Sequence, residues 1–255
     1  ATCDILIGAD SIKSMVRMFM LQEQAGRAEQ HGELAEAADL RNPVQPRWSG
    51  VITNKTTGEC HRRNTTDGRD HETVTQYGTL VDEHELRFLQ HIVAYPISHR
   101  KFINFAAFDT DHTKEDSFYG ESWIRVSNSR EIVDLFRDWE PEVKQLCIRS
   151  RKVNRWTMNV VRTLPSYASG RVAILGDAAR AMTSIQAAGV GQAIEDAWIR
   201  SALLSHPLTT LNSVVQVLQI YSRIRLPLAS QVAEGSRRNS MYFCTEGVRR
   251  RYLRG

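Results

Sequence analysis

The stretch that most constrains the fold covers residues 171–204 and reads RVAILGDAARAMTSIQAAGVGQAIEDAWIRSALL. Residues 172–175 form a short apolar run with β-branched members between two glycines, which predicts a buried strand. A second glycine pair, Gly189 and Gly191, precedes a segment in which apolar and small residues recur at helical spacing. This spacing predicts an amphipathic helix, and its apolar face carries Ile194, Ala197, Trp198, Ser201 and Ala202.

Glycines at this connection would let a ligand approach the backbone closely. The amides at a helix start are unpaired and carry a partial positive charge, so the entrance near Gly189 suits an anion or the electron-rich edge of a ring. Asp177 follows the predicted strand and is placed to accept hydrogen bonds from a ligand hydroxyl. The alternative is an ordinary glycine turn between a strand and a helix, and spacing by itself does not decide between the two.

Composition limits the class of protein. With 255 residues, 42% of them apolar, the chain can bury a sizeable core as one large domain or two smaller ones. The 33 basic residues are nearly matched by 29 acidic ones, so the net charge of +4 does not indicate a nucleic-acid partner. The clearest basic cluster is a C-terminal group that we interpret as a solvated tail. It consists of Arg249, Arg250, Arg251 and Arg254.

Cysteine spacing and hydropathy bound the compartment. The four cysteines lie far apart and form no CxxC pair, so we predict free thiols in a reducing, cytoplasmic setting. No apolar stretch reaches the ~18 residues that a membrane-spanning helix needs. One polar segment holds several potential metal ligands, but no ligand spacing recurs in it, and we predict no metal site. Those ligands are His61, Asp67, Asp70 and His71.

The N-terminal part repeats the order of strand, turn and helix. Residues 4–8 (DILIG) predict a strand, and residues 9–17 predict a turn that enters a helix. Asp10, Ser14 and a nearby positive residue could receive a phosphate or a ribose, although a plain connection would have the same pattern. Residues 18–40 are rich in Ala, Glu, Gln and Arg, which predicts an exposed helix or a mobile excursion.

From Arg47 onward the pattern changes to short strands, which predict an antiparallel sheet. The predicted strands cover residues 48–54, 92–95, 102–108 and 122–126, and the polar residues 55–72 predict a loop. A structural helix is predicted after Asn128, which is spaced with Glu131 as a capping box. A further helix is predicted around residues 211–218, and Pro227 should close or bend it.

Two internal strings carry a resemblance to a known family. GDAARAM followed by AGVGQAIEDA resembles the second flavin-contacting motif of FAD-dependent aromatic-ring monooxygenases of the salicylate-hydroxylase-like group. The resemblance implies that Asp177, within Gly176–Asp177–Ala178, binds the ribityl chain of FAD. It also implies that a glycine turn and helix start lie beside the isoalloxazine ring. That stretch consists of Gly189, Val190, Gly191 and Gln192.

Further strings resemble other parts of the same family. ILIGADSIKSMVR resembles its motif that bridges FAD and the nicotinamide cofactor, which implies cofactor roles for Asp10 and Arg17. WSGVITNK and HIVAYPISHRKFINFAAF resemble its substrate-binding sheet. There Lys55 occupies the position of a functional arginine and Tyr95 that of an active-site tyrosine. The expected substrate pocket is mostly apolar, with Phe102 or Phe105 among its walls.

The resemblance implies a mixed α/β fold: a partial FAD-binding Rossmann-like domain with an inserted antiparallel-sheet substrate domain. We expect residues 1–45 and 161–255 to form the FAD-binding part and residues 46–160 the substrate domain. The family's Gly-x-Gly-x-x-Gly unit, which binds the ADP half of FAD, is absent from the sequence, which is therefore expected to begin midway through the FAD-binding domain.

The implied activity is hydroxylation of a small salicylate-like aromatic compound with FAD, NADH or NADPH, and molecular oxygen. In the family, reduced flavin reacts with oxygen to give a C4a-hydroperoxide whose distal oxygen is transferred to the ring. The alternative is a truncated or catalytically inactive derivative that serves as a binding or regulatory protein. Departures from the family pattern favour that alternative, and they are Ser11, Lys55, Arg180 and Ser184.

Overall fold

The computed structural model describes residues 2–59, 75–80, 88–99, 101–137, 139, 144, 147–148 and 153–242. The chain divides into two compact units. The first unit combines residues 1–47 and 159–240, and the second combines residues 48–158 and 241–255. Among the described helices, none is long and apolar enough to cross a membrane.

The first unit contains a small sheet built from both ends of the sequence. Its strand order is β1 (Leu6–Gly8), β9 (Val172–Ile174) and β8 (Ala168–Ser169). Strand β1 pairs with β9 in parallel, with Leu6 opposite Val172, whereas β8 pairs with β9 antiparallel. Both strands of the parallel pair lie where the sequence predicts them. The segment after β1 carries Asp10 and is called the first motif here, and the segment after β9 carries Asp177 and is called the second motif. Because β1 and β9 are parallel neighbours, both motifs begin at the same edge of this sheet.

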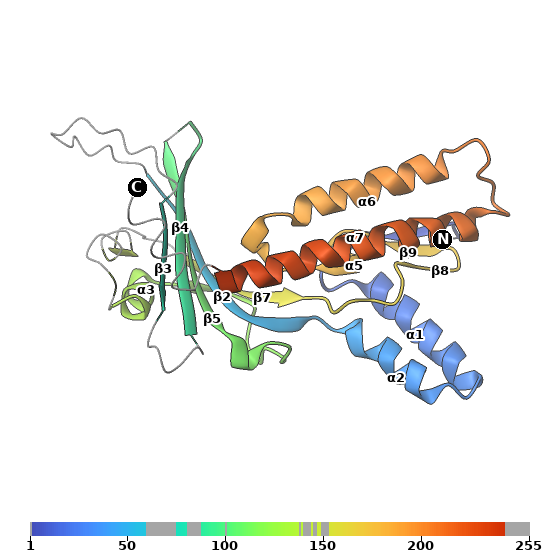
Figure 1. Ribbon diagram of the computed structural model, residues 1–255, viewed down its shortest axis with the longest axis horizontal. Helices are drawn as coiled ribbons and strands as arrows, with labels where there is room; N and C mark the ends of the chain where they lie inside the picture. The colour runs from blue at the N-terminus through green and yellow to red at the C-terminus, as the bar shows by residue number, and fades with distance from the viewer. Residues whose placement is uncertain are drawn as a thin grey trace. The chain divides into compact units, whose positions relative to one another are not determined.

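Helices surround this sheet (Figure 1). Among the described residues they are α1 (Met15–Gln30), α2 (Leu34–Arg41), α5 (Asp177–Arg180), α6 (Gly189–Leu204), α7 (Val214–Tyr242) and the short 3₁₀ turns Asn42–Val44 and Ser184–Gln186. Their apolar side chains form one core with those of the sheet, which includes Leu21, Ile174, Leu218 and Tyr221. Helix α7 continues through Pro227, so of the two predicted effects of this proline, closing or bending the helix, closing does not occur.

Residues 18–40 are largely helical, which agrees with the first of the two predicted alternatives, an exposed helix, although one face of the helices is buried. They form most of α1 and α2, which contact each other closely. Leu21, Ala25 and Ala28 lie at positions i, i+4 and i+7 of α1 and are buried. Three of the six buried residues of this segment are alanines, and a helix that is rich in alanine resembles a solvated helix in composition even where it packs against the core.

Helix α6 covers the predicted helical segment, but it begins at Gly189, so the glycine pair lies inside its first turn, and its buried face differs from the predicted one. Ile194 and Trp198 are 64% and 71% exposed, whereas Gln192 and Asp196 are buried. Ile199 and Leu203 continue the inner face toward the hydrophobic core. The apolar stripe read from the sequence is therefore turned outward, because the inner face carries polar groups that bind a buried arginine described below.

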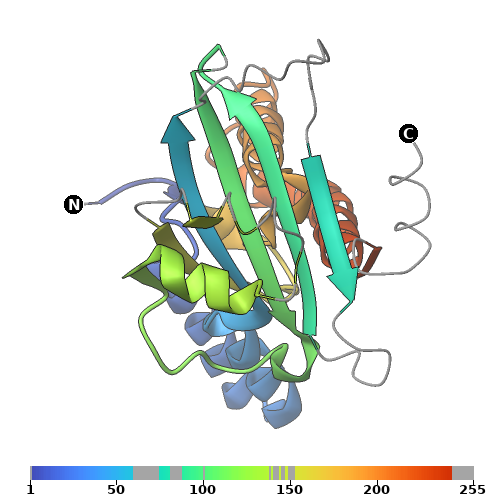
Figure 2. The same ribbon diagram turned by 90° about the vertical axis from the view of Figure 1, so that its left-hand side faces the viewer.

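The second unit contains a six-stranded sheet with the order β3-β4-β5-β2-β7-β6 among the described residues. Every pair for which a register is given is antiparallel, which confirms the predicted type of sheet. Its strands, seen face-on in Figure 2, are β2 (Arg47–Glu59), β3 (Thr75–Leu80), β4 (Phe88–Ile97), β5 (Phe102–Asp111), β6 (Ile124–Ser127) and β7 (Val153–Val160). The predicted loop is wrong at its start, because residues 55–59 extend β2, and its residues 60–72 lie outside the described residues.

Helix α3 (Ser129–Leu135) covers one face of this sheet (Figure 2). Its N-terminus is capped as predicted, since the Asn128 side-chain oxygen accepts a hydrogen bond from the Glu131 amide at 3.0 Å. Ile132 of α3 packs with Phe105 and Ala107 of β5 in one buried cluster. Because side chains alternate along a strand, this cluster identifies the odd-numbered positions of β5 as the covered face. A short 3₁₀ turn, His112–Lys114, follows β5.

His91 lies on the other face of the sheet and titrates abnormally. Its imidazole stacks on Phe108 with ring centroids 4.3 Å apart, and burial lowers the pKa of His91 from 6.5 to about 4. Only the neutral imidazole is therefore compatible with the folded state near neutral pH. Its contribution to stability is complete above pH 6.5 and is lost as the pH falls toward 4, where the loss reaches roughly 3 kcal/mol.

We expect His91→Leu to remove this part of the acid dependence. The measurement is the free energy of unfolding in urea between pH 7 and pH 4, compared between the wild type and the variant. An equal slope over this range in the two proteins would show that His91 is not the titrating group.

Candidate functional site

Gly176 forms the sharp turn between β9 and α5. Its backbone has φ 58° and ψ −137°, a conformation that residues with side chains rarely adopt. A Cβ atom at this position would lie 3.2 Å from the Cβ atom of Ala193 in α6, which is tighter than ordinary contact. Both the backbone conformation and the close approach of α6 therefore require glycine here.

Asp177 follows this glycine as the first residue of α5 and is exposed. Its carboxylate forms no hydrogen bond with any residue that the structure describes. Although the residue is exposed, partial desolvation of its carboxyl group raises the pKa of Asp177, and the Arg180 guanidinium opposes that rise. The carboxylate lies at the end of β9, where it can accept hydrogen bonds from a ligand.

The start of α6 lies against the same turn and is open. Its first amides have no side-chain cap, and a Cβ atom at Gly189 or Gly191 would meet no heavy atom within 4 Å. Packing therefore does not require glycine at either position. Val190 is 74% exposed, whereas Gln192 is buried. A bare, uncapped helix start of this kind gives a flat or electron-rich group direct access to backbone amides.

Asp10 of the first motif holds the start of α1. Its carboxylate accepts hydrogen bonds from the Ser14 hydroxyl at 2.6 Å and from the amides of Met15 at 2.7 Å and Val16 at 3.2 Å. Desolvation raises the pKa of Asp10, but these hydrogen bonds outweigh it and leave the pKa below its ordinary value. Asp10 is therefore an ionised helix cap at neutral pH.

Ser11 stands where the family motif has its second glycine. Its φ angle of 67° lies in the left-handed region, which costs a residue with a side chain roughly 1–2 kcal/mol. The backbone conformation that glycine would favour is thus present in this chain although the glycine is not.

Arg17 is 1% exposed and joins the two motifs. Its guanidinium donates to the carbonyl oxygens of Ala178 at 2.8 Å, Ile12 at 2.5 Å and Val44 at 3.3 Å. Burial lowers the pKa of Arg17, and the carboxylate of Asp10 opposes that effect. The structure therefore places this predicted cofactor residue in contact with α5, where its guanidinium is hydrogen-bonded to the backbone of Ala178 in the second motif.

Arg180 brings a buried positive charge to the second motif, where the family usually has histidine. It is 5% exposed, and its Nε and Nη1 atoms have no hydrogen-bond partner among the described residues. Burial raises the pKa of the neighbouring Tyr167, and the Arg180 guanidinium opposes that rise. The motif thus has a cation close to Asp177.

In the second unit, the strand register places Lys55 and Tyr95 on the same face of the sheet. Lys55 pairs with Ala106 and Tyr95 pairs with Asn104, both on β5 between them. Two strand spacings separate the residues, which corresponds to about 10 Å across the sheet. Lys55 is half-buried, and desolvation lowers its pKa, whereas Tyr95 is 39% exposed.

Phe102 and Phe105, the two residues expected to line the substrate pocket, lie on opposite faces of the six-stranded sheet. Phe102 lies on the face of Lys55 and Tyr95, and it is 39% exposed. Phe105 lies on the opposite face and is buried beneath α3, so it cannot line a pocket that Lys55 and Tyr95 share. The two-residue period of the strand decides this, because residues 102 and 105 have opposite parity.

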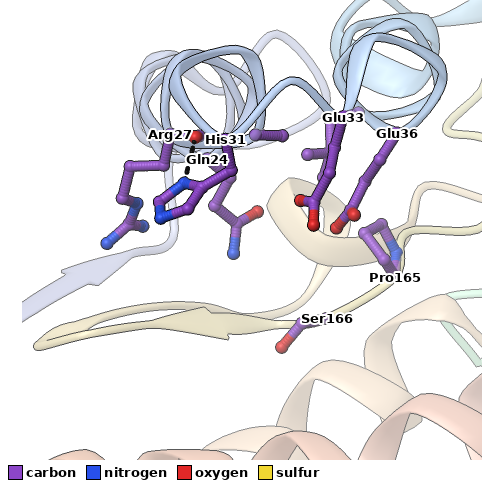
Figure 3. Close-up of a pocket in the computed structure, with 9 residues that line it drawn as sticks. Gln24, Arg27, His31, Glu33, Glu36, Pro165 and Ser166 are labelled. Atoms are coloured by element: carbon purple, nitrogen blue, oxygen red, sulfur yellow. Dashed lines mark hydrogen bonds between the residues drawn. The ribbon is translucent and has the colours of Figure 1, made fainter.

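A pocket of about 270 Å³ lies elsewhere in the first unit, between α1, α2 and the segment at Pro165 (Figure 3). Its charged and polar lining includes Arg27, His31, Glu33 and Glu36. None of the residues singled out from the sequence lines it. No group of three or more potential metal ligands occurs among the described residues, and the segment with His61, Asp67, Asp70 and His71 lies outside them.

Two buried residues near the turn escaped the sequence analysis. Asp196 of α6 accepts a hydrogen bond from the Gly176 amide at 2.9 Å, and Arg225 of α7 donates to Asp196 at 2.6 Å. The sequence did contain a signal for Asp196: this acidic residue lies four positions after Gln192, so the two side chains share one face of the predicted helix. It has meaning only once the partner arginine is known.

Comparison with known proteins shows which proteins the chain resembles. A family model described as an FAD-binding domain matches residues 122–236. The FAD-dependent monooxygenase str9 of Strobilurus tenacellus is 32% identical, over 94% of this chain and 55% of that protein. A salicylate hydroxylase of Pseudomonas putida is 31% identical, over 92% of this chain and 50% of that protein.

Comparison of the fold with solved structures gives a match of the same kind. A solved structure of a salicylate hydroxylase substrate complex superimposes with a TM-score of 0.77 and 26% identity, over 95% of this chain and 56% of that chain. This match confirms the predicted mixed α/β fold. The chain spans about half the length of the curated relatives that it matches. By its sequence and its fold, the chain is similar to FAD-dependent monooxygenases, among them salicylate hydroxylase.

Proposed function

We propose that the protein is an FAD-dependent monooxygenase that uses NADH or NADPH and molecular oxygen to hydroxylate a small, salicylate-like aromatic compound. The observation that carries this proposal is the open carboxylate of Asp177 beside the bare helix start at Gly189. Internal stability does not require a carboxylate that has no hydrogen-bond partner among the described residues, nor glycines at which an added Cβ atom would meet no heavy atom within 4 Å.

The residues of the first unit fit the middle and ring portions of FAD. Asp177 accepts hydrogen bonds from hydroxyl groups of the linking chain, and charge assistance makes such bonds stronger than neutral ones. The uncapped amides from Gly189 to Gly191 face the electron-rich edge of the ring system. Bound FAD would supply the electron transfer and oxygen activation that amino-acid side chains cannot perform.

The sheet face with Lys55 and Tyr95 is the proposed substrate surface. Lys55 binds and orients an acidic group such as the carboxylate of a salicylate-like compound, and partial burial strengthens that attraction. Tyr95 offers a hydroxyl group and an aromatic face for the substrate ring. A lysine lacks the planar fork of the family's arginine, so this carboxylate is held by one point charge.

The test has two stages. FAD is first titrated into the purified protein, with binding followed by the quenching of flavin fluorescence, and we expect saturable binding. NADH and then NADPH oxidation is followed with and without salicylate, and we expect oxidation to rise when the aromatic compound is present. Absence of FAD binding would contradict the assignment as a flavoprotein.

The same experiment separates the alternative function. A catalytically inactive binding or regulatory protein would bind FAD or the aromatic compound and yet oxidise no NADH or NADPH with any aromatic acid tested. Ser11, Lys55, Arg180 and Ser184 are then the positions to restore to the family pattern, and recovered oxidation would locate the cause of the inactivity.

A further inference from the structure

A buried ion pair lies behind the turn at Gly176. Asp196 of α6 is 0% exposed, and Arg225 of α7 is 1% exposed. The Nε atom of Arg225 donates to Oδ1 of Asp196 at 2.6 Å, while Oδ2 accepts a hydrogen bond from the Gly176 amide at 2.9 Å. One carboxylate therefore connects α7 to the backbone of the turn that presents Asp177.

The other guanidinium nitrogens of Arg225 hold the first two turns of α6. Nη2 donates to the side-chain oxygen of Gln192 at 2.9 Å, and Nη1 donates to Glu195 at 2.8 Å. Gln192 in turn donates to the same Glu195 carboxylate at 3.1 Å. The planar fork of arginine thus bonds three side chains in fixed directions, which the single ammonium group of lysine cannot do.

Helix α7 is itself anchored on both sides of the turn. The Tyr221 hydroxyl donates to the Ile174 carbonyl oxygen at 3.0 Å, just before the turn in the sequence. The Ser236 hydroxyl donates to the Thr183 carbonyl oxygen at 2.7 Å, beyond α5. Arg225 therefore projects from a helix whose position relative to β9 and the segment after α5 is determined independently.

Stability alone is a weak explanation for such a pair. A buried ion pair often contributes no more than a well-packed apolar pair of similar volume, because both charges lose their hydration. The charged network also fixes geometry. Its hydrogen bonds hold the Gly176 amide, in the turn before Asp177, and the Gln192 side chain, near the start of α6, at set positions. A ligand that touches both the turn and the helix start depends on that spacing.

We infer that Arg225 and Asp196 are positioning residues for flavin, which fix the Asp177 turn and the start of α6 in the geometry that receives one ligand. This inference rests on the proposed function, namely that these two elements contact FAD. Neither residue touches the ligand. Their effect is transmitted through the Gly176 amide and through Gln192.

The first test is Arg225→Lys, which keeps the charge and loses the fork. We expect the dissociation constant for FAD, measured by fluorescence titration, to rise at least fivefold. In the protein without FAD, we expect hydrogen exchange of the Gly176 amide and of peptides covering residues 188–193 to accelerate at least tenfold, while α1 exchanges as in the wild type. Unchanged exchange at both places would overturn the inference.

Two matched controls lie on the same helix. Arg238→Lys alters an exposed arginine that pairs with Glu234, and it should change neither FAD affinity nor exchange. Leu218→Val removes one methylene from the buried core and lowers the melting temperature without touching the network. If Leu218→Val weakens FAD binding as much as Arg225→Lys does at an equal loss of melting temperature, the network has a merely structural role and the inference fails.

Failure of the proposed function would look different. A wild-type protein that binds no FAD contradicts the proposed function, while the exchange measurement still decides whether Arg225 positions the turn. If Arg225→Lys does not fold, the double variant Asp196→Asn with Arg225→Met removes both charges together. It should fold and show the same accelerated exchange at residues 188–193, and normal protection there would overturn the inference.

Discussion

Replacing Asp177 by alanine is expected to weaken FAD binding at least tenfold. The carboxylate has no hydrogen bond to other described residues, so its removal leaves no protein group unsatisfied. A hydrogen bond from a ligand hydroxyl to a charged carboxylate contributes about 1.5–3 kcal/mol, and 1.4 kcal/mol corresponds to a factor of ten in affinity. The measurement is a fluorescence titration of FAD with the wild type and the variant.

The Asp177→Ala variant has a matched control in Asp39→Ala. Asp39 is also an exposed aspartate on a helix of the first unit, and it lies on α2. Its replacement should leave the dissociation constant within a factor of two of the wild-type value. Asp177→Asn should lie between the wild type and Asp177→Ala, since an amide oxygen accepts a weaker hydrogen bond. Equal affinity in the wild type and a folded Asp177→Ala variant would contradict the assignment.

The local parts of this site could be predicted from the sequence because their causes are local. A β-branched run ended by a glycine predicts β9 and its turn, and the Gly176 conformation depends on that residue and its immediate neighbours. The capping pair Asn128 and Glu131 is equally local, with donor and acceptor three positions apart in the sequence. Such features need no knowledge of what packs against them.

The orientation of α6 could not be predicted in the same way. Its apolar residues Ile194 and Trp198 are exposed, and its inner face holds Asp196 instead. The pattern of hydrophobic residues identifies a helix, but the buried face is decided by an arginine 29 positions further along the chain. An arginine so far along the chain does not alter the hydrophobic periodicity of α6, so the sequence of the helix does not reveal it. A buried aspartate also contradicts the usual expectation that acidic residues are exposed.

The same limit applies to the roles of single residues. The resemblance assigns Arg17 a cofactor role, whereas the structure shows its donors directed at backbone carbonyls. For Phe102 and Phe105, the sequence places both on one strand, and only the strand register separates their faces. Motif membership thus identifies the right neighbourhood, while contacts decide what each side chain does there.

Arg17 offers the largest expected effect on stability. Arg17→Met should lower the free energy of unfolding by roughly 3–5 kcal/mol, because three backbone carbonyl oxygens lose a charged donor at once. The carbonyl oxygens of Ala178, Ile12 and Val44 would lose the donor that satisfies them inside the first unit. Each buried carbonyl left without a donor costs roughly 1–3 kcal/mol, and an apolar side chain of similar length fills the space without replacing those bonds.

Unfolding of the variant in urea at pH 7 measures this loss, and Arg27→Met is the matched control on the same helix. Arg27 is exposed, and its guanidinium contacts two surface side chains, the Glu23 carboxylate at 3.8 Å and the Ser169 hydroxyl at 2.8 Å. Replacing Arg27 should therefore lower the free energy of unfolding by at most about 0.5 kcal/mol. A loss below about 1 kcal/mol for Arg17→Met would mean that water or neighbouring groups satisfy the three carbonyl oxygens. In that case Arg17 would not be what holds the first motif to Ala178, and the two motifs would depend on the parallel pairing of β1 and β9 for their common geometry.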